Sequence, residues 1–153
     1  MPGNEVTIIG AGIGGLTAAL ALQHCDIPVR VFEQARELGE IGAGLHLSPN
    51  GMKVLAALGL GDAIERIRFQ PEALAMRHYA TGSAFFENPF DDAFRARFGA
   101  PFYGFHRADL HRMLHDAVIA NDPHCIVVNK RLAALSEHDD VVELEFADGE
   151  RCP

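Results

Sequence analysis

Residues 5–33 read EVTIIGAGIGGLTAALALQHCDIPVRVFE, and this stretch decides the fold. It begins with an apolar, β-branched run over 5–10, which is typical of a parallel strand buried on both faces. After a glycine loop, an alanine- and leucine-rich stretch predicts a helix over 14–25. Asp26-Ile27-Pro28 ends that helix, and the stretch VRVFE at 29–33 predicts a second strand. Strand, helix and strand in this order form a βαβ unit, so we expect an α/β fold.

The glycine loop fits the spacing G-x-G-x-x-G between the strand and the helix. Gly10 allows a sharp turn, Gly12 lets the backbone approach a pyrophosphate, and Gly15 lets the helix pack close to the strand. Gly14 lies at the start of the helix, where free N–H groups and the helix dipole favour phosphate. Glu33 follows Gly15 by 18 residues and ends the second strand, where a carboxylate can accept hydrogen bonds from a ribose diol. We therefore expect a dinucleotide-binding site.

The composition argues against several classes of partner. With 153 residues, of which 48% are hydrophobic, the chain is long enough to bury a core as one domain. Its net charge of -8 disfavours binding to nucleic acid or to an anionic membrane surface, because both need a basic face. No apolar run approaches the length of a membrane span. The three cysteines have no regular spacing, so we expect a cytoplasmic protein in which each is a small buried side chain.

Local patterns predict the remaining elements. A helix over 48–58 can be capped by its first residue, a serine, and a hairpin is expected over 73–88. Apolar residues at helical spacing over 110–118 indicate an amphipathic helix. Alternation over 142–146 predicts a strand, and Asp148-Gly149 is typical of a hairpin turn.

The phenylalanines are unevenly distributed along the chain. Seven of the ten lie between Phe85 and Phe105. They can form an aromatic wall beside a flat substrate, or they can pack in the core between layers. We favour core packing, because most phenylalanines in folded proteins are buried.

The stretch 42–50, GAGLHLSPN, followed by a helix and by Gly59-Leu-Gly61, resembles the single-component FAD-dependent aromatic hydroxylases. The stretch 105–111, FHRADLH, resembles them too. The resemblance covers essentially the whole chain and is strongest to members that act on 6-hydroxynicotinate, salicylate and 3-hydroxybenzoate. It implies a Rossmann-like FAD-binding domain, in which a parallel sheet with flanking helices carries a β-hairpin or meander and part of a substrate-side β-sheet.

The resemblance also implies which residues bind the cofactor. They are Gly10, Gly12, Gly14, Gly15, Glu33, Gln34, Gly44, Arg107 and Leu132. The four loop glycines hold the FAD pyrophosphate, and Glu33 with Gln34 meets the adenosine ribose. Gly44 lies by the flavin, and Leu132 contacts the adenine end through its backbone. The guanidinium of Arg107 suits diphosphate and ribose oxygens, although an ion pair with Asp109 at the helix start is the alternative.

His46 is the candidate catalytic residue. In the 6-hydroxynicotinate branch of the family, the matching histidine is the suggested base that activates the substrate hydroxyl. An imidazole suits this task because it exchanges a proton near neutral pH, and deprotonation of the hydroxyl moves electron density to the carbon that is attacked. The alternative is that His46 packs against the flavin or donates one hydrogen bond to it.

Three other histidines lie near one another in the sequence. His111 and His115 are four residues apart on the predicted helix, and His106 precedes it. They lack a His-Glu-x-x-His pattern and a carboxylate at ligand spacing, so we expect no metal site. We interpret them as a solvated flank of the helix.

The resemblance implies an FAD-dependent monooxygenase that consumes NADH or NADPH and O₂ and hydroxylates a small phenolic or N-heteroaromatic carboxylate. We predict an FAD-binding βαβ region over 1–70, a contribution to the substrate domain over 71–100, and the rest of the FAD-binding domain over 101–153. Family members are considerably longer and carry later cofactor motifs that have no counterpart here. We therefore expect a truncated N-terminal portion that is inactive alone, with unpaired strand edges that favour a homo-oligomer.

Two other functions fit the glycine loop. One is an NAD-dependent dehydrogenase, which would share the dinucleotide fingerprint. The second glycine-rich stretch, Gly39 to Gly44, and the motif around Arg107 argue against it. The other is a non-catalytic nucleotide-binding fragment, which differs from an enzyme in binding FAD or AMP without turnover.

Overall fold

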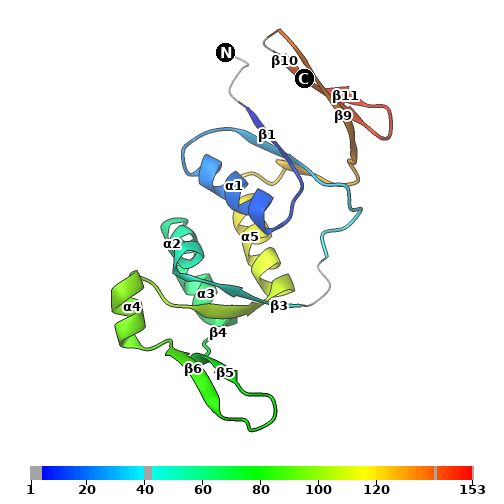
Figure 1. The fold of residues 1–153 in the computed structure, drawn as a ribbon. Helices are drawn as coiled ribbons and strands as arrows, with labels where there is room; N and C mark the ends of the chain where they lie inside the picture. The colour runs from blue at the N-terminus through cyan, green and yellow to red at the C-terminus, as the bar shows by residue number, and fades with distance from the viewer. Residues whose placement is uncertain (1–4, 40–42, 140, 153) are drawn as a thin grey trace. The chain divides into compact units, whose positions relative to one another are not determined.

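The structure is a computed structural model, and it describes residues 5–39, 43–139 and 141–152. The chain divides into two compact units (Figure 1). The first unit comprises Met1–Glu40 and His111–Pro153, and the second comprises Ile41–Leu110. Helix α5 (Arg107–Asn121) crosses the boundary between them in the sequence. The functional division into 1–70, 71–100 and 101–153 stays a prediction.

The first unit is built on the predicted βαβ motif. Strands β1 (Val6–Ile9), β2 (Val29–Phe32) and β8 (Ile126–Val127) form a parallel sheet in the order β1-β2-β8. Helix α1 (Ile13–Gln23) connects the first two strands (Figure 1). It buries Leu16, Ala19 and Leu20. The α/β class and the parallel sheet predicted from the sequence are confirmed.

The expectation that β1 is buried on both faces is wrong. Val6 and Ile9 are 37% and 47% exposed. In the sheet that the structure describes, β2 is the central strand and β1 pairs with it on one side only. The β-branched run therefore predicts the strand correctly, while its burial depends on its place in the sheet.

An antiparallel sheet of β9 (Leu132–His138), β10 (Val141–Phe146) and β11 (Arg151–Cys152) completes the first unit. Leu144 and Phe146 are buried, as the alternation predicts, and the Phe146 ring lies 4.7 Å from that of Phe32. At the β10–β11 turn, the Lys130 ammonium contacts the carboxylates of Asp148 and Glu150. The hydrogen bond from Lys130 holds the pKa of Asp148 below its usual range.

The second unit contains a three-stranded antiparallel sheet, a hairpin and three short helices. The sheet has the order β3-β7-β4. Its strands are β3 (Gly44–Leu47), β4 (Arg68–Phe69) and β7 (Tyr103–His106). The hairpin is β5 (Ala73–Arg77) with β6 (Ala84–Pro89), and it ends one residue beyond the predicted range of 73–88. The helices are α2 (Pro49–Ala57), α3 (Gly61–Ile67) and α4 (Asp92–Phe98).

Ser48 occupies the N-cap position of α2, but its hydroxyl makes a different bond from the predicted one. It donates to the side-chain oxygen of Asn50 and caps no backbone N–H. Pro49 begins the helix, and the missing N–H of proline is harmless at this position. The helix therefore starts where the sequence predicts, through proline geometry and without a serine cap.

The preference for core packing of the clustered phenylalanines is correct for Phe105 and wrong for others. Phe105 is 4% exposed, whereas Phe85, Phe86 and Phe98 are 71%, 46% and 41% exposed. Four of the rings contact one another in succession: Phe102 stacks on Phe90, Phe94 meets Phe90 edge-on, and Phe98 is tilted against Phe94. Short α4 and a two-stranded hairpin cannot bury every ring that they carry.

The cysteines differ in exposure, which leads to a labelling prediction. Cys125 is buried as expected and Cys152 is intermediate, but Cys25 is exposed. Burial raises the pKa of the Cys125 thiol, so this residue has little reactive thiolate at neutral pH. We expect a thiol reagent to modify Cys25 at least about tenfold faster than Cys125, as read by peptide mass spectrometry. Cys25→Ser should remove the fast phase, and rapid labelling of Cys125 in the folded protein would contradict the burial argument.

Candidate functional site

The glycine loop joins β1 to α1 in a conformation that depends on two of its glycines. Gly10 has φ +99°, a region that side chains rarely adopt, and its N–H donates to the Phe32 carbonyl at 2.7 Å. At Gly15 a Cβ atom would lie 2.0 Å from the Gly10 carbonyl oxygen. Gly10 therefore makes the turn, and Gly15 allows the helix to lie against it, as the spacing predicts.

The other two loop glycines border open space. A Cβ atom at Gly12 or Gly14 would meet no atom within 4 Å. Gly12 is the N-cap of α1, and no side chain caps this end of the helix. The first N–H groups of a helix have no partner within it, and they carry the positive end of the helix dipole. The start of α1 can thus accept an anionic group, and the loop leaves room for one.

Glu33 directly follows β2 and reaches back to the loop. Its Oε2 accepts a hydrogen bond from the Ala11 N–H and its Oε1 accepts one from the Ala35 N–H, each at 2.8 Å. The Glu33 backbone is held as well, because its N–H donates to Val127 and its carbonyl accepts from Lys130. Each carboxylate oxygen keeps a further lone pair, with which it can accept a bond from a ribose hydroxyl.

A cavity of about 100 Å³ lies where the loop and the residues after β2 meet. Its lining consists of Ala11, Gly12, Glu33, Ala35, Glu37, Leu38, Gly39 and His111. The predicted Gln34 lies beside it in the sequence and is exposed. Leu132 is also in the first unit, at the start of β9, where it pairs with Phe146. Its predicted backbone contact with adenine stays a prediction.

His111 corrects the interpretation of the histidines. It is 6% exposed, and its Nε2 lies 2.7 Å from the Ala11 carbonyl oxygen. His106 is exposed, and His115 contacts Asp116. His111 shares a helical stripe with Leu114 and Val118, and this spacing is the signal that could have indicated its burial. Among the described residues, no three His, Cys, Asp or Glu side chains cluster as they would around a metal.

Three predicted residues belong to the second unit, where two of them come close together. Strand β3 pairs with β7 so that Gly44 faces His106, and the Arg107 N–H donates to the Ala43 carbonyl at 2.9 Å. This register brings the backbone around Gly44 beside the start of α5. Residues 40–42 of the second glycine-rich stretch lie outside the described residues.

His46 is exposed on β3 and faces Gly104 of β7. A Cβ atom at Gly104 would lie 3.3 Å from His46 Cδ2 and 3.2 Å from a ring carbon of Phe69. The imidazole also stacks on Phe102, with ring centres 5.5 Å apart. Gly104 on the neighbouring strand thus leaves room for the imidazole, and Phe102 stacks on it. His46 stays exposed to solvent.

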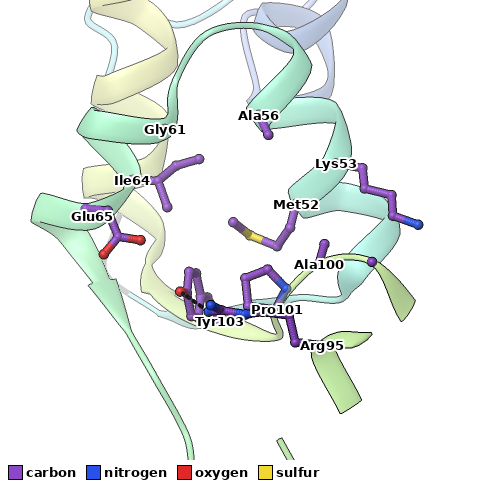
Figure 2. A pocket seen from close by; sticks show the side chains of 11 residues that line it. Met52, Lys53, Ala56, Gly61, Ile64, Glu65, Arg95, Ala100, Pro101 and Tyr103 are labelled. Atoms are coloured by element: carbon purple, nitrogen blue, oxygen red, sulfur yellow. Dashed lines mark hydrogen bonds between the residues drawn. The ribbon is translucent and has the colours of Figure 1, made fainter. Parts of the chain in front are cut away.

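A second cavity, of about 350 Å³, lies within the second unit (Figure 2). Met52 from α2 and Ile64 from α3 point into it, and Arg95 donates a hydrogen bond to the Tyr103 hydroxyl at 3.1 Å (Figure 2). Lys53 and Glu65 lie at its edges. None of the residues predicted to bind cofactor lines this cavity, and neither does His46.

The model of the FAD binding domain family matches residues 4–151, which is nearly the whole chain. The chain belongs to the FAD-binding flavoprotein monooxygenase family. The family resemblance noted in the sequence is therefore confirmed.

Relatives in this family share sequence along most of the chain. This chain is 38% identical to 3-amino-4-hydroxybenzoate 2-monooxygenase of Streptomyces cremeus, and the match covers 95% of this chain and 36% of that protein. It is 35% identical to 6-hydroxynicotinate 3-monooxygenase of Bordetella bronchiseptica, over 95% of the chain and 37% of that protein. The chain thus spans little more than a third of the length of the curated relatives it matches.

A solved structure in the family supports the fold. Klebsiella pneumoniae HpxO complexed with FAD and uric acid superposes with a TM-score of 0.83 at 30% identity. The match covers 97% of this chain and 36% of that one. In the described part of this chain, no helix is long and apolar enough to cross a membrane.

The residues of the first unit fit the cofactor that defines the family. The free N–H groups at the start of α1 suit a pyrophosphate, and the open space at Gly12 and Gly14 admits it. The Glu33 carboxylate, bound to the same loop, suits a ribose diol. The individual contacts to FAD remain predictions.

Proposed function

We propose that this chain is the FAD-binding part of an NADH- or NADPH-consuming monooxygenase that hydroxylates a phenolic or N-heteroaromatic carboxylate. The observation that carries the proposal is the glycine loop at the start of α1. No side chain caps this end of the helix, and the Glu33 carboxylate accepts a hydrogen bond from the Ala11 N–H of the loop. Membership of the FAD-binding family favours a flavin enzyme over an NAD-dependent dehydrogenase. The names of the two relatives support the substrate class, since 3-amino-4-hydroxybenzoate and 6-hydroxynicotinate are both hydroxylated aromatic carboxylates.

The first unit would hold the adenosine half of FAD. Gly10, Gly12, Gly14 and Gly15 would bind the pyrophosphate through backbone N–H groups and the dipole of α1. Glu33 and Gln34 would hold the ribose, and Leu132 would meet the adenine through its backbone. The carboxylate of Glu33 favours a ribose diol and repels a phosphate in its place, because two negative charges would then share one small cavity.

The second unit would supply the residues near the reacting ring. Gly44 would lie by the flavin, and Arg107 would reach cofactor oxygens with its guanidinium. His46 would remove the proton from the substrate hydroxyl, which enriches the ring in electrons before it is oxidised. FAD, when bound, supplies the redox chemistry that links NAD(P)H and O₂ to hydroxylation.

A titration of the full-length protein with FAD tests the proposal. We expect wild-type protein to bind FAD and to show NAD(P)H-dependent hydroxylation of a hydroxylated aromatic carboxylate. Glu33→Ala should weaken FAD binding by about 10- to 100-fold, since it removes charged hydrogen bonds to the ribose and one bond to the loop. The affinity for the aromatic substrate, measured in FAD-saturated protein, should change little.

Glu37→Ala is the matched control, because Glu37 lines the same cavity but has no bond to the glycine loop among the described contacts. It should bind FAD almost as well as the wild type. Equal weakening of FAD and of aromatic substrate in Glu33→Ala would count against the ribose role. FAD binding without turnover would favour the non-catalytic nucleotide-binding alternative.

A further inference from the structure

We propose that His111 is a positioning residue that orients the Gly12 N–H for the cofactor pyrophosphate. The proposal rests on the proposed function, because it deepens the role given to the glycine loop. It concerns a buried histidine that contacts the loop through one backbone atom. His111 itself would touch no reacting atom.

The loop is held at two consecutive peptide groups. The N–H of the Gly10–Ala11 peptide donates to the Glu33 carboxylate at 2.8 Å. The carbonyl of the Ala11–Gly12 peptide lies 2.7 Å from His111 Nε2. Ala11 is only 1% exposed, so both of these peptide groups are shielded from solvent. The two side chains together fix the planes of both peptides.

The chemistry of the second contact defines the proton on the imidazole. A carbonyl oxygen has no hydrogen to donate, so the hydrogen bond requires that Nε2 of His111 carries one. In the neutral ring this selects the Nε2–H tautomer. Leu114 and Val118, on the same stripe of α5, are fully buried and anchor the helix that carries the ring.

The direction of the Gly12 N–H follows from this bond. In a trans peptide the C=O and N–H groups point in opposite directions, so a donor that holds the Ala11 carbonyl turns the Gly12 N–H away from itself. Gly12 borders open space and lines the cavity beside Glu33. Glycine-rich loops have many accessible conformations, and each fixed peptide plane reduces the entropy lost when a phosphate binds.

The test replaces His111 in the full-length protein with residues that keep or remove the donor. His111→Gln can still donate from its terminal amide, whereas His111→Met has similar bulk and no donor. We expect His111→Met to weaken FAD about tenfold and His111→Gln to recover most of that loss. The Gly12 amide resonance, observed without FAD, should shift in the Met variant and return towards its wild-type position in the Gln variant.

His115→Met is the control, since it lies one turn further along α5 and its imidazole contacts Asp116 beside it. It should change FAD affinity by less than about twofold. A merely structural role would lower thermal stability equally in both His111 variants without a difference between them in FAD affinity.

Three results would overturn the proposal. One is wild-type FAD affinity in a folded His111→Met protein, and another is equal weakening in the Gln and Met variants. The third needs no variant: nitrogen chemical shifts that show the Nδ1–H tautomer of His111 in the wild type. If the wild type itself fails to bind FAD, the proposed function fails, and the Gly12 resonance and the tautomer still decide the role of His111.

Discussion

Replacement of His46 by glutamine is expected to slow hydroxylation by about 100- to 10,000-fold while FAD affinity stays close to that of the wild type. Glutamine keeps a polar group of similar reach but cannot take up a proton. In the structure the imidazole is exposed and stacks on Phe102, opposite Gly104, so its ring has space and a defined setting. The rate of product formation per reduced flavin, measured in single-turnover experiments, separates this step from flavin reduction.

The pH dependence distinguishes a base from a packing residue. As the pH rises towards the pKa of the substrate hydroxyl, solution removes the proton and the difference between mutant and wild type should shrink. His78→Gln is a matched control, because His78 is an exposed histidine that also stacks on an aromatic ring, that of Tyr79. Wild-type hydroxylation with an unchanged pH profile in His46→Gln would make His46 a spectator.

Gly15→Ala is expected to destabilise the protein by about 3 kcal/mol or more and to abolish FAD binding with it. The added Cβ would lie 2.0 Å from the Gly10 carbonyl oxygen and 3.3 Å from a methyl carbon of Ile8. The first of these atoms is backbone, so the clash cannot be relieved by rotating a side chain. Either α1 moves away from β1 or the loop changes its conformation. Chemical denaturation of the apoprotein measures the loss.

Gly14→Ala provides the comparison within the same helix turn. A Cβ at this position meets no atom within 4 Å, and alanine favours a helix over glycine by about 1 kcal/mol. The apoprotein should therefore unfold at the same denaturant concentration as the wild type or at a higher one. Equal unfolding midpoints for Gly15→Ala and the wild type would show that the helix and strand approach each other less closely than the structure indicates.

Much of the fold was predictable because its signals are local. The β-branched run, the glycine spacing and the alanine-rich helix predict β1, the loop and α1 from residues a few positions apart. The position of Glu33 after β2 follows from the same count along the chain. Some short elements were not predicted, among them α4 and the two-residue strands β4 and β8. An element this short does not show a clear hydrophobic periodicity.

The exposure of individual side chains could not be predicted in the same way. Val6 and Ile9 have the composition of buried strand residues, yet they are exposed, because the described part of the chain leaves the faces of β1 partly uncovered at these positions. Phe85 and Phe86 belong to a two-stranded hairpin, which has no further layer in the described structure to cover both faces. Burial depends on which elements pack together, and hydrophobicity alone does not specify those partners.

The sequence by itself was sufficient for the α/β class, the dinucleotide fingerprint and the family. Each rests on residue types at fixed spacings along the chain, and such spacings can be read without knowing the tertiary structure. The hydrogen bond between His111 and the Ala11 carbonyl joins residues 100 positions apart, and it forms only because the fold brings His111 of α5 beside the loop. The stacking of His46 on Phe102 likewise depends on the register between β3 and β7. Contacts between distant segments arise from tertiary packing, because no local pattern encodes which helix face meets which loop.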